Sequence, residues 1–373
     1  MDIWILRDIR QRVDNLLIAA FLVAICLTLL ITPFVIKLAH KLGATDAPNN
    51  RKVHTKVMPS MGGLAIFLSF LITLPIFSPG IARSETFSAI LLGAAVIVIL
   101  GIFDDIYELN AKAKLLGQIV AALIIVIGGD IQVNYINTPF GGEPIEFGFL
   151  AIPITVIWIV GITNAINLID GLDGLAAGVS TIALLTISGM AIFRIGDMFV
   201  AMIALVLAGS TLGFLKFNFF PAKIFMGDTG AMFLGFMISV LSLLGFKNVT
   251  VISLIIPIVI LGVPISDTFF AIVRRVLQKK PLSAPDKSHL HHCLLRLGYS
   301  HRTTVLMIYA MAGLFGLAAF IFSMATLWGG IFMIFILLVA LELLVERIGL
   351  LGEDHRPLHK LLALRSANVK DRS

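Results

Sequence analysis

The chain has 373 residues, of which 58% are hydrophobic and 13% are charged, with a net charge of +6 and a mean hydropathy of +1.01. A soluble core could not bury that much apolar surface, so the composition excludes a soluble globular protein. Two cysteines, Cys26 and Cys293, are too few for a disulfide framework, and membrane topology explains the positive charge without a nucleic-acid partner.

Long apolar stretches dominate the chain. A membrane-spanning helix needs about 20 largely apolar residues, because the bilayer interior offers no water to backbone groups. We therefore predict an all-α polytopic membrane protein with about eleven transmembrane helices. In chain order these are 16–36, 61–78, 87–103, 113–129, 150–168, 175–193, 198–215, 230–246, 251–273, 305–323 and 327–346.

The stretches divide the chain into three parts. Residues 1–15 are predicted to be an extracytoplasmic tail, 16–346 a single transmembrane domain and 347–373 a basic cytoplasmic tail on the membrane surface. The loop 130–149 is expected to form a simple turn or hairpin.

One set of alternate loops holds 22 of the 28 Lys and Arg residues, and the other set holds 6. Cytoplasmic loops carry the excess of these residues, so we expect the N-terminus outside and the C-terminus in the cytoplasm.

Polar residues concentrate in the predicted cytoplasmic loops. Asp104 and Asp105 follow the apolar run "VILGIF" directly. Adjacent carboxylates repel each other unless a cation or proton compensates, and Mg²⁺ prefers carboxylate and phosphate oxygens. A solvated helix end is the structural alternative.

The stretch "TNAINLIDGLDGLAAG" places four polar groups at the end of the fifth predicted span. Asn164 and Asn167 share a helix face, while Asp170 and Asp173 lie in or beside a turn whose glycines allow close approach to a ligand. Pairing with neighbouring helices is the alternative. Four polar groups with two glycines favour a binding site, because intramembrane ionisable groups are usually functional.

Two further motifs carry candidate residues. In "FMGDTG", Asp228 lies just before the eighth predicted span, where free helix amides suit an anion or its metal; an ordinary N-cap is the alternative. In "SHLHHC", imidazoles precede two arginines, which favours a loop that binds a diphosphate over a zinc site or a solvated basic loop. The residues of this loop are His289, His291, His292, Arg296 and Arg302.

Four motifs together resemble one known family. They are "GIFDDIYELNAKAKLLGQ", "NAINLIDGLDGLAAG", "FMGDTGAMFLGF" and "HLHHCLLRLGYSHRTT". They are similar to those of the polyprenyl-phosphate N-acetylhexosamine-1-phosphate transferases, over a match from about Asp46 to about Thr304. The resemblance is closest to the bacterial undecaprenyl-phosphate GlcNAc-1-phosphate transferases that initiate wall teichoic acid synthesis.

This resemblance implies a reaction. GlcNAc-1-phosphate would pass from UDP-GlcNAc to undecaprenyl phosphate with release of UMP, in a bacterial cell membrane, at an active site facing the cytoplasm. The enzyme would depend on Mg²⁺, with Mn²⁺ as a substitute, and would contact membrane lipid; a homodimer is one further expectation. Alternatives are another UDP-N-acetylhexosamine or UDP-MurNAc-pentapeptide as donor.

The resemblance also assigns roles to residues. Asp228 would be a direct metal ligand, with Asp104 and Asp105 near the metal and the lipid phosphate. Phe225 would stack on uracil. The other implied substrate contacts are Asn167, Asp170 and Asp173 near the uridine or the metal, His289, His291 and His292 at the diphosphate, Arg296 and Arg302 near the sugar-phosphate, and Arg51, Lys52 and His54 in the first basic loop.

A proton-coupled transporter is the alternative from a different class. Its candidate acids are Asp267, Glu342 and Glu346. Transporter sites usually lie near the bilayer midplane, whereas Asp267 and Glu342 lie in the cytoplasmic halves of their predicted spans. The distribution of acids therefore favours an enzyme.

Overall fold

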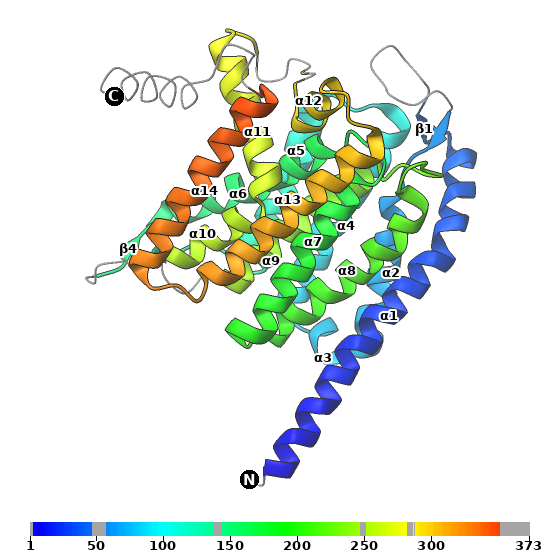
Figure 1. The fold of residues 1–373 in the computed structure, drawn as a ribbon. Helices are drawn as coiled ribbons and strands as arrows, with labels where there is room; N and C mark the ends of the chain where they lie inside the picture. Colours follow the sequence, from blue (N-terminus) through cyan, green and yellow to red (C-terminus); the bar gives the residue numbers. More distant parts are fainter. Residues whose placement is uncertain are drawn as a thin grey trace, which may run out of the picture.

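The computed structural model describes residues 3–46, 57–136, 143–246, 251–281, 286 and 288–350. Most of them are helical (Figure 1). The helices are α1 Ile3–Leu42, α2 Gly63–Phe77, α3 Pro79–Ala82, α4 Glu85–Tyr107, α5 Ala111–Leu123, α6 Ala151–Ile169, α7 Leu175–Met190, α8 Met198–Asn218, α9 Gly227–Phe246, α10 Val251–Ile260, α11 Gly262–Leu277, α12 Leu290–Arg296, α13 His301–Phe322 and α14 Leu327–Ile348. Four two-residue strands pair antiparallel, β1 Thr45–Asp46 with β2 Met58–Pro59 and β3 Tyr135–Ile136 with β4 Ile145–Glu146.

The helices agree with a polytopic membrane protein. Within the described ranges, nine helical segments are long and apolar enough to cross a bilayer. The predicted span 61–78 corresponds to α2, which has 15 residues. The predicted span 251–273 is divided into α10 and α11. Pro264 favours this break, because it has no amide hydrogen to donate to the carbonyl of Ile260.

Helix α1 is longer than the first predicted span. It has 40 residues, begins at Ile3 and so includes most of the segment 1–15. At 1.5 Å per residue such a helix is about 60 Å long, roughly twice the hydrocarbon thickness of a bilayer. Figure 1 shows its N-terminal part running past the other helices. The predicted hairpin within 130–149 is confirmed by the pairing of β3 with β4.

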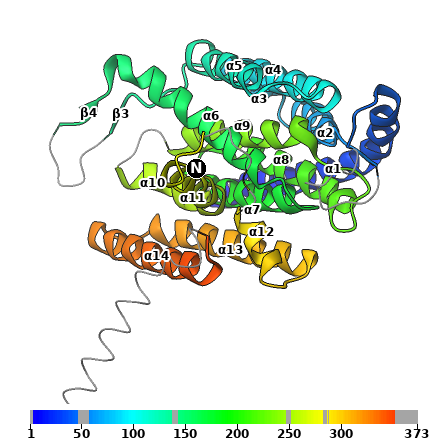
Figure 2. The same cartoon turned by 90° about the horizontal axis from the view of Figure 1, so that it is seen from above.

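Helix α9 lies at the centre of the bundle. It packs against α4 and α6 and also contacts α2 and α7, while α13 packs on α7 and α14 lies outermost (Figure 2). Small residues bring the backbones of α2 and α4 against its first turn. A Cβ on Gly63 would lie 2.0 Å from Gly230 Cα, and one on Gly101 would lie 2.3 Å from Thr229 Cα. The start of α9 is therefore held beside the end of α4.

Several helix ends meet at one end of the bundle. The C-terminal ends of α4 and α6, the start of α9, strand β1 and helix α12 lie on the same side, opposite the N-terminus of α1 (Figure 1). The polar motifs of the sequence are thereby gathered, although they are far apart along the chain.

Candidate active site

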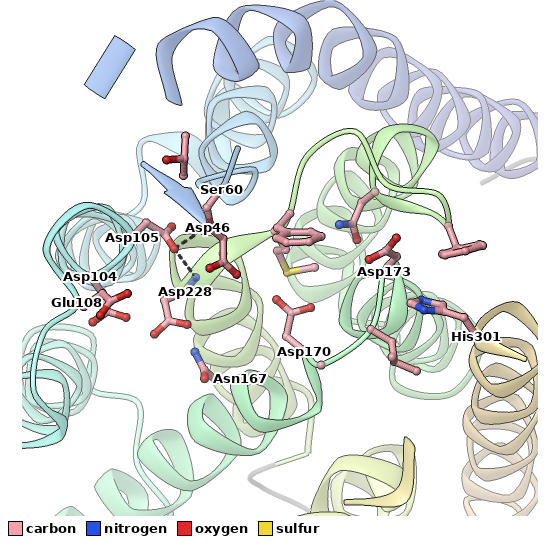
Figure 3. Close-up of a pocket in the computed structure, with 18 of the residues that line it drawn as sticks. Asp46, Ser60, Asp104, Asp105, Glu108, Asn167, Asp170, Asp173, Asp228 and His301 are labelled. Atoms are coloured by element: carbon pink, nitrogen blue, oxygen red, sulfur yellow. Dashed lines mark hydrogen bonds between the residues drawn. The ribbon is translucent and has the colours of Figure 1, made fainter. Parts of the chain in front are cut away.

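A cavity of about 520 Å³ opens at this end of the bundle (Figure 3). Its described lining contains no Lys or Arg, and its carboxylates are Asp46, Asp104, Asp105, Glu108, Asp170, Asp173 and Asp228. Other lining residues include Ser60, Asn167, Asn218, Phe220, Phe225, His292 and His301. So many acids in one cavity repel each other and create strong demand for a cation.

Asp104 and Asp228 share one cation in the structure. The Lys114 ammonium on α5 lies 3.0 Å from Asp104 Oδ2 and 2.8 Å from Asp228 Oδ2. Asp104 Oδ1 accepts a hydrogen bond of 2.7 Å from the backbone amide of Leu109. Asn167 donates a side-chain hydrogen bond to Asp228. Carboxylates from α4 and α9 thus converge on a single positive charge.

Asp105 holds the start of α9. Its Oδ1 accepts from Ser60 Oγ and from the Asp228 amide, both at 3.0 Å. Its Oδ2 accepts from Thr229 Oγ1 at 2.6 Å and from the Thr229 amide at 3.2 Å. Gly227 is required between these groups, since its φ is +70° and a Cβ there would lie 2.4 Å from Asp105 Oδ2. Asp105 therefore holds the backbone at the start of α9 and in this way orients Asp228.

The turn between α6 and α7 is bound to the last residue of α8 and to the segment that follows it. The Gly174 amide donates to Asn218 Oδ1 at 3.1 Å, and the Ala222 amide donates to Asp173 Oδ2 at 2.9 Å. Gly174 has a φ of +79°, a conformation that favours glycine. These contacts fix the turn so that Asp170 points into the cavity (Figure 3).

Asp170 has a strongly perturbed carboxyl. Burial raises its pKa from 3.8 to about 8, and the charges of Asp228, Asp105 and Asp173 add to the rise. The carboxyl of Asp170 ionises at a lower pH in the unfolded chain than in the folded protein. Its contribution to stability is therefore fully present below the unfolded pKa and is lost as pH rises through the folded pKa.

This pKa predicts a pH-dependent stability. In EDTA, the Tm of the wild-type protein should fall between pH 6 and pH 8 by more than the Tm of Asp170→Asn, because the amide cannot ionise. Thermal unfolding of both proteins at the two pH values measures the difference. Equal losses of Tm would show that Asp170 is ionised throughout this range.

Asn164, predicted to share the site, lies elsewhere. Its Nδ2 donates to Gln118 Oε1 at 2.6 Å and to the Val160 carbonyl at 2.8 Å, and the side chain does not line the cavity. The amide therefore joins α6 to α5, which is the packing alternative considered above. Asn167, one turn further along α6, does line the cavity.

The three histidines of the "HLHH" motif lie in different environments. His292 lines the cavity, whereas His289 and His291 are buried outside its lining. His291 Nε2 has no hydrogen-bond partner among the described residues, and its ring packs against Gly171, where a Cβ would lie 2.3 Å from that nitrogen. Burial, with the charge of His292, lowers the pKa of His291 to about 3. His291 is therefore neutral at physiological pH and brings no positive charge to an anion.

Aromatic side chains line the cavity at two points. Phe225 is held by its backbone, since its amide donates to Pro59 O at 2.9 Å. Phe220 stacks on His301, with ring centroids 4.4 Å apart. These rings give the cavity flat apolar surfaces next to its acids.

The predicted basic residues are placed differently from one another. Arg302 lies over the ring of Phe219, with 5.8 Å between the guanidinium carbon and the ring centroid. Arg296 contacts Cys293 Sγ at 3.6 Å. Neither arginine is part of the cavity lining. Arg51, Lys52 and His54 lie outside the described residues.

The donor set suits a magnesium ion better than zinc. Among the residues that the structure describes, no group of three or more His, Cys, Asp or Glu side chains is arranged to hold a metal. A structural zinc site needs four such ligands, whereas Mg²⁺ is usually held by one or two carboxylates with substrate phosphates and water. Asp104 and Asp228, whose oxygens share Lys114, offer the two carboxylates that are typical of a Mg²⁺ site.

Several cavity residues were not predicted as site residues. They are Asp46, Ser60, Glu108, Asn218, Phe220 and His301. Lys114 was not predicted either; it is not part of the cavity lining, but from α5 it binds Asp104 and Asp228. Lys114 had a signal in the sequence: Asn110 accepts from the Ala113 amide as N-cap of α5, so Lys114 lies near the start of a helix that follows Asp104 closely. The others required knowledge of the tertiary fold.

Comparisons with known proteins identify relatives of this chain. A model of glycosyl transferase family 4 matches residues 87–246. The chain is 51% identical over 345 residues to a probable undecaprenyl-phosphate N-acetylglucosaminyl 1-phosphate transferase of Bacillus subtilis, covering 92% of this chain and 95% of the relative. It is 38% identical to a decaprenyl-phosphate N-acetylglucosaminephosphotransferase of Mycobacterium leprae, covering 81% and 83%. A phospho-N-acetylmuramoyl-pentapeptide-transferase of Halalkalibacterium halodurans is 31% identical, covering 81% and 95%.

Proposed function

The chain belongs to glycosyl transferase family 4, and on that premise we propose that it transfers GlcNAc-1-phosphate from UDP-GlcNAc to undecaprenyl phosphate, releasing UMP. The observation that supports this most directly is the convergence of Asp104 and Asp228 on one cation inside an acidic cavity. A cavity of this charge repels phosphates unless a divalent cation is bound. The similarity to the Bacillus subtilis transferase supports GlcNAc rather than another sugar.

Asp104 and Asp228 are the residues proposed to hold Mg²⁺, with Mn²⁺ as a substitute. When bound, the ion would neutralise phosphate charge and polarise the phosphoryl group. Lys114 lies between the two carboxylates and is placed to pair with a phosphate oxygen once they bind the metal. His292 and Phe225 line the same cavity and are placed to contact the diphosphate and the uracil.

Bringing two phosphates together is the main energetic obstacle. At about 4 Å and an effective dielectric constant near 20, each pair of unit negative charges costs roughly 4 kcal/mol. Phosphoryl transfer is catalysed mainly by alignment and charge neutralisation. A bound metal ion, Lys114 and the hydrogen-bond donors near the phosphates would therefore account for more of the catalysis than a base would.

A dedicated general base is not required. The second pKa of a phosphate monoester is near 6, so the lipid phosphate is already largely a dianion at neutral pH. Asp104 is also poorly placed for this role, because one of its oxygens accepts from Leu109 N and the other from Lys114. We therefore propose direct attack of the lipid phosphate on the β-phosphorus of the donor.

The proposed location is a bacterial cell membrane with the site facing the cytoplasm, as the first membrane step of a cell-wall glycopolymer, teichoic acid in our proposal. The supporting observation is charge: the loops at the cavity end belong to the set that holds 22 of the 28 basic residues.

A donor comparison tests the function. The purified chain, with undecaprenyl phosphate and Mg²⁺, is offered UDP-GlcNAc, UDP-GalNAc or UDP-MurNAc-pentapeptide, and UMP is measured. UDP-GlcNAc should give the highest kcat/KM, by about 100-fold or more over the pentapeptide donor. A preference for another donor would contradict the assigned sugar, and vesicle uptake of UDP-GlcNAc without UMP release would identify a transporter.

Gly171→Ala should weaken donor binding. Its Cβ would lie 2.3 Å from His291 Nε2, so the ring must move, and the ring of His292 lies 4.1 Å from that of His291. We expect the KM for UDP-GlcNAc to rise about tenfold, because small misplacements of binding groups are costly. Gly189→Ala is the matched control, since its Cβ would meet nothing within 4 Å. Equal KM values in both variants would show that the His291 ring adapts.

A further inference from the structure

Asp267 is a buried acid on α11 that the cavity does not use. Only 2% of its surface is exposed, and it does not line the cavity that holds Asp104 and Asp228. Both of its oxygens bind the histidine segment: Oδ2 lies 2.9 Å from His289 Nδ1, and Oδ1 accepts from the Leu290 amide at 2.7 Å. Leu290 is the first residue of α12, so Asp267 fixes both a histidine ring and the start of this helix.

A second buried pair lies two turns along α11. Arg274 binds Asp286 through Nε and Nη2, and its Nη1 donates to the Leu350 carbonyl at 2.6 Å. Burial alone would raise the pKa of Asp286, but hydrogen bonds from Arg274 and the Ser288 amide hold it below its usual value. Residues seven apart share a helix face, so Asp267 and Arg274 present one face of α11 to the histidine segment.

The histidine rings form a row from Asp267 to the cavity. The rings of His289 and His291 are nearly parallel, with 6.1 Å between their centroids, and those of His291 and His292 are 4.1 Å apart. Only His292, at the far end of the row, lines the cavity. A shift of His289 would therefore be passed through packed rings to His292, which faces the cavity.

We infer that Asp267 is a positioning residue, which through His289 and the start of α12 places His292 against the diphosphate of the donor. This inference rests on the proposed function. Asp267 does not touch the substrate in this scheme. Burying a carboxylate without hydrogen bonds costs free energy, so Asp267 keeps its contacts with His289 and the Leu290 amide. The resulting rigidity keeps His292 in place against the donor.

The scheme also gives a role to an acid that would suit a proton-coupled transporter. A transport acid needs access to a water-filled pathway, whereas both Asp267 oxygens are occupied by protein donors. His289, expected to bind the diphosphate, uses its Nδ1 for the acid instead.

The test is Asp267→Asn in the full-length protein. The amide oxygen can still accept from the Leu290 amide, but the NH₂ group can only donate to His289 Nδ1. The variant therefore replaces a charged acceptor with a neutral donor and restricts the ring to the tautomer with its hydrogen on Nε2. We expect the KM for UDP-GlcNAc to rise about tenfold, with the KM for undecaprenyl phosphate changed less than twofold. In a His292→Ala background the same substitution should change the donor KM by less than twofold, because the two residues act in series.

Asp197→Asn is the matched control. Asp197 caps α8 through bonds to the amides of Phe199 and Val200, and α8 places it 21 residues from the cavity residue Asn218, about 30 Å away. It should leave both KM values unchanged. The inference is overturned if Asp267→Asn behaves like this control, if it lowers only kcat with both KM values unchanged, or if its effect persists without His292.

Hydrogen–deuterium exchange gives a readout that does not depend on catalysis. The Leu290 amide and the rest of α12 should exchange faster in Asp267→Ala than in the wild-type protein, and the Asp197 control should leave α12 unchanged. Unchanged exchange in α12 overturns the inference. Absence of UMP release by the wild-type protein would instead refute the proposed function. The exchange data would still show whether Asp267 stabilises the start of α12.

Discussion

Replacing Asp228 with alanine is expected to remove most of the UMP release from UDP-GlcNAc. Asp228 shares the Lys114 ammonium with Asp104 and is oriented by Asp105 through its own backbone amide. Without its carboxylate, Asp104 alone would face the metal, and the phosphates would meet with less charge compensation. We expect kcat/KM to fall by about 100-fold to 1,000-fold or more, as for loss of a major electrostatic group.

Two measurements check this prediction. Initial rates of UMP release with saturating Mg²⁺ give the loss of activity, and titration with Mn²⁺ followed by electron paramagnetic resonance gives the loss of metal binding. Asp197→Asn, at the end of α8 that lies away from the cavity, controls for the general effect of substitution in this membrane protein. Near-normal turnover in Asp228→Ala would refute the assignment of Asp228 as a metal ligand.

Replacing Lys114 with methionine is expected to change activity and metal binding in opposite directions. The ammonium lies within 3.0 Å of the two carboxylate oxygens proposed to bind Mg²⁺, so it competes with the ion for them. Removing it should tighten binding of Mn²⁺. It should also reduce turnover by about 100-fold, because a cation that could neutralise phosphate charge is lost.

Lys112→Met is the matched control for this variant. Lys112 lies on the same helix, two residues earlier, and is exposed. It should alter neither quantity by more than about twofold, because exposed charges interact weakly in water. Weaker Mn²⁺ binding in Lys114→Met would contradict the competition, and full activity would show that Lys114 does not assist the phosphates.

The sequence predicted a polytopic helical membrane protein and several of the regions that line the cavity. The lengths of the apolar stretches alone indicate a polytopic helical protein, because the bilayer interior requires each span to satisfy its own backbone hydrogen bonds. Asp104, Asn167, Asp170 and Asp228 are brought into one cavity because the helices that carry them end on the same side.

Side-chain direction was not predictable in the same way. Asn164 shares a helix face with Asn167, yet its amide pairs with Gln118, because the depth of a residue between two helices depends on their packing. The motif "HLHH" likewise treats three histidines as equivalent, although only His292 reaches the cavity. His289 turns toward Asp267, which lies 22 residues earlier in the chain. Such partners are set by tertiary packing.

The backbone contacts among α2, α4 and α9 divide the molecule into two mechanically different halves. At Gly63 and Gly101 there is no room even for a methyl group, so the acids from α4 and α9 cannot slide past one another. Hydrogen bonds and ring packing hold the histidine half on α11, α12 and α13 together as a unit. This unit meets the turn after α6 through a side chain, that of His291 against Gly171, and such a contact can shift more easily than packed backbones. Widening of the cavity to admit one product and release another is therefore expected to be a motion of the histidine half against a fixed acidic half.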